Sequence, residues 1–194
     1  MRKLIRLLQV LLIVALAVII AFAFNVVHNQ NYKGGYSSAT ICTEKARNFI
    51  LKEFGDCKSP KQLLANLNKF ACKRFTYVKK GVYLQYFDID EFIFEDNFHG
   101  LCWDFACFTK ITVLEVARYN GWQDVSALVC DAEYTGNGEK HSFNFVTIGN
   151  TVYHIDNTFD NTRYKNGEKP HGAREVLNKD LYLQVNNMEL INYH

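Results

Sequence analysis

The sequence lacks the surplus of basic residues that a nucleic-acid-binding surface needs. It has 22 Lys and Arg against 20 Asp and Glu among 194 residues, a formal net charge of +2. Three of the basic residues, Arg2, Lys3 and Arg6, lie at the extreme N-terminus, and without them 19 basic residues face 20 acidic ones, a net charge of −1. Proteins that bind nucleic acid carry clustered positive charge. We therefore expect no nucleic-acid partner.

Cysteine patterns typical of metal sites and redox centres are also missing. The six cysteines stand at positions 42, 57, 72, 102, 107 and 130, with no C-x-x-C pair and no Cys/His spacing that indicates zinc. We therefore expect no metal and no cofactor. Cys102 and Cys107 would lie about 140° apart around a helix and cannot pair, which argues against a thiol–disulfide redox protein. Cys57 and Cys72 flank a predicted helix and are the one disulfide candidate.

The first 27 residues are typical of a membrane-targeting segment. Basic residues precede an apolar run of 18 residues, Leu7 to Phe24, that only Gln9 interrupts. The run can just span a bilayer as an uncleaved anchor, whereas Ala21-Phe22-Ala23 offers an A-x-A cleavage site for a signal peptide, and both alternatives stay open. Basic residues on the N-terminal side keep that end in the cytoplasm. The rest of the chain is thus expected outside, either membrane-anchored or secreted.

The length of the chain favours one domain. We predict a signal peptide or transmembrane anchor over 1–27, a polar linker over 28–42 and a single domain over 43–194. Apolar residues make up 48% of the chain, with 15 Phe and 11 Tyr, so the domain can bury a substantial core. No internal repeat or low-complexity tract is visible, and nothing indicates an oligomeric state.

Two helices are predicted at the start of the domain. Apolar residues recur at helical spacing after Thr43, at Ala46, Phe49, Ile50 and Phe54. The second helix has clearer start signals, with Ser59 as N-cap, Pro60 at the first helical position and Gln62 completing a capping box. Residues 75–98 are aromatic and acidic without a clear period, which is typical of a long loop with short strands.

A buried helix and a strand hairpin follow. Trp103 to Asn120 is apolar on nearly all sides and stops before Gly121, which predicts a helix in the middle of the domain. Strands are predicted over Asp124–Asp131, His141–Ile148 and Thr151–Asp156, with turns at 136–138 and 149–150. The expected fold class is therefore α+β, with a central buried helix packed on an antiparallel β-sheet.

One cysteine stands where a nucleophile is expected. Cys102 directly precedes the buried helix, where N–H groups and the helix dipole favour a thiolate and can hold an oxyanion. Gly100 would let the backbone turn sharply there and keep the sulfur accessible. Counting out from the 149–150 turn, 148 pairs with 151, so the first residue of the second strand, His141, comes close to the last residue of the third, Asp156. A carboxylate in that place can orient an imidazole base.

Four short motifs resemble those of transglutaminase-like domains. Gly100-Leu101-Cys102-Trp103-Asp104-Phe105-Ala106 resembles the family's G-x-C-x-D-aromatic-A motif. His141-Ser142-Phe143-Asn144 is similar to H-x-W-N with Phe in place of Trp, and Ile155-Asp156-Asn157-Thr158 to I/L-D-x-T. Phe75-Thr76-Tyr77 resembles an F-x-Y element that often lies upstream. The three catalytic motifs keep the family order of Cys, His and Asp.

This resemblance implies a papain-like core and a catalytic triad of Cys102, His141 and Asp156. It implies a thiol mechanism on amide bonds of a protein or peptide substrate, ending in hydrolysis by a peptidase or amidase or in cross-linking acyl transfer. The chain lacks the large flanking β domains of animal transglutaminases, so their calcium dependence is not expected. The alternative is a non-catalytic transglutaminase-like binding domain at the cell surface.

Three further polar residues near the motifs have weaker functional signals. His99 precedes Cys102 by three residues and could tune it. His154 alternates onto the strand face of Asp156, although a surface position is the stronger expectation. Asp104 is expected to be a first-turn carboxylate that complements the helix dipole.

Overall fold

The computed structural model describes residues 42–78, 87–186 and 188–193. The expected signal or anchor segment and nearly all of the linker lie outside these residues. No helix within the described ranges combines the length and the apolar character that crossing a membrane requires.

Two capped helices begin the described chain. Helix α3 spans Glu44–Phe54, and its N-cap Thr43 accepts a hydrogen bond from the Ala46 N–H at 3.0 Å. Helix α4 spans Pro60–Arg74, with Pro60 in its first turn and the Ser59 hydroxyl accepting from the Gln62 N–H at 3.2 Å. Both predicted helices are confirmed. Their cap residues accept hydrogen bonds from backbone N–H groups that the start of a helix leaves unpaired.

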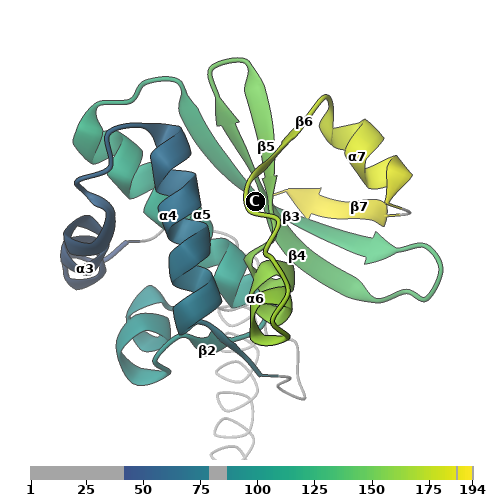
Figure 1. Cartoon of the computed structure of the whole chain (residues 1–194), viewed down its shortest axis with the longest axis horizontal. Coiled ribbons are helices and arrows are strands. Elements are labelled where there is room, and N and C mark those ends of the chain that lie inside the picture. The colour runs from purple at the N-terminus through teal and green to yellow at the C-terminus, as the bar shows by residue number, and fades with distance from the viewer. Residues whose placement is uncertain (1–41, 79–86, 187, 194) are drawn as a thin grey trace, which may run out of the picture.

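The central helix α5 spans Cys102–Asn120 and ends at Gly121, which adopts the left-handed conformation with φ of 69°. Of its 19 residues, 14 are buried, because α3 and α4 cover one side of it and the sheet covers the other. Figure 1 shows α4 lying alongside α5, with the strands beyond them. The predicted buried helix is confirmed.

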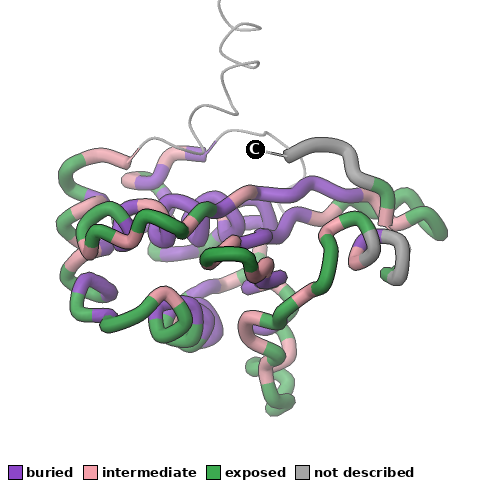
Figure 2. Tube along the Cα trace, turned by 90° about the horizontal axis from the view of Figure 1, so that it is seen from above, coloured by how far each residue is buried: buried purple, intermediate pink, exposed green. Residues whose placement is uncertain are grey.

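Five strands form one antiparallel sheet in the order β6-β5-β4-β3-β7. They are β3 (Val125–Tyr134), β4 (Lys140–Ile148), β5 (Thr151–Ile155), β6 (Arg174–Val176) and β7 (Met188–Tyr193). The main core surrounds α5, with α3, α4 and the aromatic segment before α5 on one side and β3, β4 and β5 on the other, and Figure 2 shows the buried positions gathered in the middle of the molecule. The expected class, α+β with a central helix on an antiparallel sheet, is confirmed.

A smaller core covers the opposite face of the sheet. Phe143 and Phe145 of β4 pack there with Leu183 of helix α7 (Lys179–Val185). Helix α6 (Asn157–Lys165) follows β5 directly and packs on α4. The sequence pattern beyond residue 160 predicted neither α7 nor the two edge strands, because these segments are short and only weakly periodic.

The aromatic segment before α5 contains short elements, as expected. Strand β1 (Thr76–Tyr77) pairs in parallel with β2 (His99–Gly100), and between them Glu91–Glu95 forms a single turn of π-helix, η1. The π-helix was not predicted. It places Phe92 and Ile93 in the core, so burial rather than periodicity decides its conformation.

The disulfide candidate is wrong. All six cysteines lie within the described residues and none of them forms a disulfide. Cys57 and Cys72 are separated by nearly the whole of α4, and a helix rises about 1.5 Å per residue, so the two sulfurs cannot meet. Cys107 and Cys130 are fully buried, as their apolar surroundings predict.

Candidate active site

The predicted nucleophile occupies the first position of the central helix. Cys102 is the first residue of α5, with Leu101 as the N-cap. Asp104 reaches back from the third position, and its Oδ2 accepts the Leu101 N–H at 2.7 Å. The expected first-turn carboxylate is thus a capping group, which fixes the turn that carries the sulfur.

Gly100 is required for a different reason from the one expected. Its φ is not among the positive values in the described chain, and it lies in strand β2 rather than in a sharp turn. A Cβ at this position would come within 2.7 Å of Asp104 Oδ2 and 2.8 Å of Asp104 Cβ. The glycine therefore leaves room for the carboxylate that caps α5.

The β4–β5 hairpin brings the other two candidates together. Ile148 pairs with Thr151 and Asn144 with Ile155, which is the predicted register. His141 Nε2 lies 2.6 Å from Asp156 Oδ2 as a result. A carboxylate oxygen can only accept, so Nε2 carries the proton and donates to Asp156.

Asp156 has a second partner that fixes its orientation. It is the N-cap of α6, and its Oδ1 accepts the Phe159 N–H at 2.9 Å. Burial opposes its ionisation, but the charge and hydrogen bond of His141 and the Phe159 N–H hold the pKa of Asp156 below its ordinary value. One carboxylate thus caps a helix and orients an imidazole at the same time.

His141 contacts Cys102 as well as Asp156. Burial disfavours its charged form, but the charge and hydrogen bond of Asp156, followed by a hydrogen bond with Cys102, raise the pKa of His141 to about 10. Because Nε2 faces Asp156, Nδ1 is the ring nitrogen left for the sulfur. The structure therefore brings all three predicted residues together, with the His141 ring between the Asp156 carboxylate and the Cys102 sulfur.

Two tyrosines border this arrangement. Burial, then the charge of Cys102, raises the pKa of Tyr77, and burial, then Asp156, raises the pKa of Tyr134. The Tyr134 ring stacks beside the His141 ring with centroids 6.4 Å apart. Both phenols are therefore neutral neighbours of the site. The F-x-Y element pointed to Tyr77, whereas no sequence signal singled out Tyr134.

The triad is only slightly open to solvent. The side chains of His141 and Asp156 are 15% and 14% exposed. Cys102 is 3% exposed. The expectation that Gly100 would keep the sulfur accessible is thus wrong, because the packing around the start of α5 encloses Cys102.

The remaining histidines differ from expectation in part. His154 is buried rather than on the surface, and its Nε2 lies 3.0 Å from the Tyr182 hydroxyl. Burial lowers the pKa of His154 to about 4, so it is a neutral core residue on the α7 side of the sheet. His99 is exposed, and its Nδ1 donates to the Asp96 carbonyl at 2.7 Å. No group of three or more His, Cys, Asp or Glu in the described ranges is arranged to hold a metal ion.

The fold and these three side chains define an α+β protein with a candidate thiol triad. No protein-family model matches the chain, and no curated protein matches it. Several solved structures are similar to it. One is a protein from Cytophaga hutchinsonii proposed to be a cysteine protease, at 19% identity and a TM-score of 0.45, covering 78% of this chain and 49% of its own.

The second similar structure is LapG of Legionella pneumophila, at 13% identity and a TM-score of 0.47, covering 86% of this chain and 82% of its own. The third is a TGase, at 15% identity and a TM-score of 0.38, covering 68% of this chain and 37% of its own. This chain thus spans about half of the first and less than half of the third. At such identities the chemistry has to be argued from the side chains themselves.

Proposed function

We propose that the chain is a thiol enzyme acting on amide bonds of proteins or peptides. Cys102 is the nucleophile, His141 the acid and base, and Asp156 the group that orients His141. The observation that carries the proposal is the position of His141, hydrogen-bonded to Cys102 and, at 2.6 Å, to Asp156. This is the arrangement that an activated thiol requires.

The raised pKa of His141 favours an ion pair in the resting site. The Cys102 proton then resides on Nδ1, and the thiolate attacks the amide carbonyl carbon while the carbonyl electrons move to oxygen. When that intermediate collapses, the carbon–nitrogen bond breaks and His141 protonates the departing amine. A thioester and a neutral imidazole remain.

The second half of the reaction restores the enzyme. Neutral His141 removes a proton from water or from an amine, which attacks the thioester carbon and expels the Cys102 thiolate. Water gives hydrolysis and a lysine amine gives a cross-link. The proposal covers both outcomes, since the same thioester serves each.

The start of α5 suits the charge that develops in this mechanism. Cys102 is at the first helical position, so the positive end of the helix dipole lies beside the sulfur and the reacting carbonyl. We assign the Cys102 N–H to the oxyanion in the intermediate. The basic and then apolar N-terminus supports an extracytoplasmic site of action.

The experiment that tests the proposal is intact-mass analysis after brief treatment with iodoacetamide near pH 6.5. Burial raises the pKa of Cys42 and of Cys72 to about 11 and of Cys130 to about 12, and it raises that of Cys107 strongly, whereas Cys57 is enclosed in the core. These thiols should stay unmodified. We expect one adduct in the wild type, none in Cys102→Ala and one in the matched control Cys72→Ala.

The near-complete burial of Cys102 favours a second candidate, a non-catalytic binding domain that retains the triad as a structural cluster. The iodoacetamide experiment also distinguishes the enzyme from the binding domain. A closed sulfur would leave the wild type unlabelled on the timescale on which free cysteine reacts completely. That result, together with no turnover of peptide amides, would replace the enzyme proposal by the binding one.

A further inference from the structure

A pocket of about 530 Å³ lies away from the triad, between α4 and the segment that follows α6. Neither Cys102 nor His141 nor Asp156 lines it. Helix α6 begins beside the triad at Asn157 and reaches the pocket with Tyr164, near its other end. The volume falls within the range of small-molecule sites. This cavity is therefore distinct from the proposed active site.

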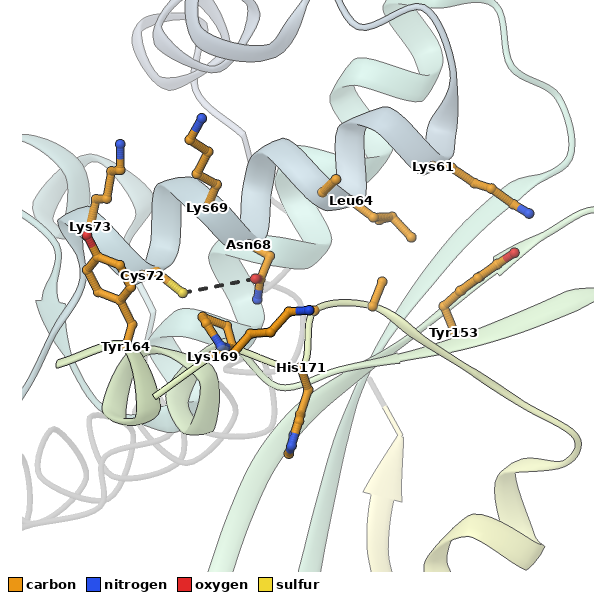
Figure 3. A pocket seen from close by; sticks show the side chains of 14 residues that line it. Lys61, Leu64, Asn68, Lys69, Cys72, Lys73, Tyr153, Tyr164, Lys169 and His171 are labelled. Atoms are coloured by element: carbon orange, nitrogen blue, oxygen red, sulfur yellow. Dashed lines mark hydrogen bonds between the residues drawn. The ribbon is translucent and has the colours of Figure 1, made fainter. Parts of the chain in front are cut away.

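The charged side chains that line the pocket are lysines. Lys61, Lys69 and Lys73 come from one stripe of α4, and Lys169 comes from the facing segment, as Figure 3 shows. No Asp or Glu is among the described residues that line it. Like charges four residues apart on a helix cost about 0.2–0.5 kcal/mol, so the Lys69–Lys73 spacing is unfavourable unless an anion lies nearby.

The four lysines have no carboxylate to neutralise them among the described ion pairs. Glu168, next to Lys169 in the chain, pairs instead with Arg163 at 2.9 Å. The pKa of Lys61 is raised first by its contact with Tyr153 and further by the charge of Glu175, which does not line the pocket. The buried Asp160 carboxylate bonds to Asn68, His171 and Gly172 of the pocket wall, so four lysines outnumber one acidic group and the net charge around the pocket is positive.

The walls between the lysines are mostly apolar. Leu64 and Ala65 of α4 face Pro170 and Ala173 across the pocket. The Tyr153 ring closes one end, with the Lys61 ammonium 5.7 Å from its centroid. The Tyr153 hydroxyl is buried and lacks a geometric hydrogen-bond partner among the described residues, although Lys61 lies close enough to interact with it. The Tyr153 hydroxyl can thus bind a polar atom of a ligand inside a mostly apolar pocket.

Asp160 of α6 holds in place the segment that follows α6 and faces α4 across the pocket. Asp160 is buried, and its two oxygens accept the His171 N–H at 2.6 Å and the Gly172 N–H at 2.8 Å. Asn68 donates to the same carboxylate at 2.7 Å. The pocket is therefore preformed, which lowers the entropy cost of binding. Because these N–H groups are occupied, an anion would have to be bound by the lysines.

We propose that this pocket binds a small organic anion with an apolar body, carrying a carboxylate or phosphate group. The apolar part packs between Leu64 and Ala173, and the anionic group lies among the lysines. A polar atom on the apolar part reaches the Tyr153 hydroxyl. The site is independent of the amide chemistry proposed above.

The test uses the full chain in an uncharged detergent, dialysed to equilibrium against 1-naphthyl phosphate, with detergent alone as the blank. We expect saturable binding at one site. Inorganic phosphate lacks the apolar body and 1-naphthol lacks the charge, so each should bind at least tenfold more weakly. Equal binding of 1-naphthol, or no saturable binding of the phosphate ester, would overturn the proposal.

Matched variants locate the site. Lys69→Glu combined with Lys169→Glu should weaken binding at least tenfold, whereas Lys52→Glu with Lys58→Glu, on exposed positions outside the pocket, should change it less than twofold. Ala65→Phe fills the pocket from an exposed helix position and should abolish binding without changing the net charge. Equal losses in the pocket and control pairs, or full binding in Ala65→Phe, would overturn the assignment.

Discussion

Gly100 and Asp104 fit together as a pair at the start of the central helix. The Asp104 carboxylate occupies the space beside the Gly100 Cα, so that a Cβ there would lie 2.7 Å from Oδ2. From this place the carboxylate accepts the Leu101 N–H. The first and fifth residues of the G-x-C-x-D sequence are therefore complementary in shape, and together they fix the backbone that carries Cys102.

Gly100→Ala should destabilise the domain by about 1–3 kcal/mol, because overpacking forces the capping carboxylate away from Leu101. Urea unfolding measures the loss. Gly136→Ala is the matched control, since nothing lies within 4 Å of a Cβ there and its φ is not positive. It should stay within about 0.5 kcal/mol of the wild type. Equal effects of the two changes would show that the close approach does not matter.

The two roles of Asp156 can be separated by two substitutions. Asp156→Asn keeps an oxygen for the Phe159 N–H, whereas Asp156→Ala removes the cap and should cost a further 0.5–2 kcal/mol, roughly, in unfolding free energy. Both lose the carboxylate that stabilises the imidazolium. In serine proteases the corresponding loss lowers kcat by about 10⁴-fold, and a thiol helped by a helix N-terminus should lose less. We expect Asp156→Asn and Asp156→Ala to have similar kcat values but different free energies of unfolding.

The order of losses across the triad tests the mechanism further. Cys102→Ala removes the atom that forms the thioester, so turnover of a peptide amide should vanish. His141→Ala should be nearly as severe, and Asp156→Asn the mildest of the three, measured as kcat/KM. Residual turnover in Cys102→Ala would contradict the mechanism.

The pH dependence follows from the raised pKa of His141. Its folded value of about 10 exceeds the ordinary 6.5, so protonation favours the fold. This stabilisation is complete below pH 6.5 and is lost as the pH rises through 10. The unfolding free energy should therefore fall between these values in the wild type and less steeply in His141→Gln.

The pH dependence of activity should also report the ionisation of His141. The alkaline limb of kcat/KM should lie near pH 10, and it should move to lower pH in Asp156→Asn, because removing the carboxylate removes the largest influence that raises the pKa of His141. An alkaline limb that does not move would mean that another group controls it.

Local patterns sufficed for much of the fold and for the residues of the site. Turn chemistry at 149–150 set the hairpin register, and with it the contact between His141 and Asp156. The burial of Cys102 and His154 could not be predicted in this way. Both depend on packing between elements far apart in sequence, α5 beneath β4 and α7 over the opposite face. The role of Gly100 likewise depends on a contact in three dimensions that backbone propensity does not reveal.

The location of the domain is a separate prediction from the N-terminus. Arg2, Lys3 and Arg6 before the apolar run should keep that end in the cytoplasm. Protease added to intact cells should therefore digest residues 43–194, and a chain that starts at residue 30 should be recovered without detergent. A domain that stays protected until the cells are lysed would contradict the orientation.

Asn161 joins α6 to the end of α4 and should be the most sensitive polar residue of this contact. It is 1% exposed, and its Nδ2 lies 3.0–3.1 Å from the carbonyls of Ala71, Cys72 and Phe75 at the end of α4. The Ala71 carbonyl also accepts the Phe75 N–H, and the Phe75 carbonyl also accepts from Lys165 Nζ. Asn161→Ala leaves these buried acceptors without the amide and should cost about 1–3 kcal/mol. Asn161→Asp should cost more, because a carboxylate would face carbonyl oxygens. Thr162→Ala, at the exposed neighbouring position, should change the urea midpoint little. If Asn161→Ala were equally mild, water would have to replace the amide at these carbonyls, and α6 would not depend on Asn161 for its place beside the triad.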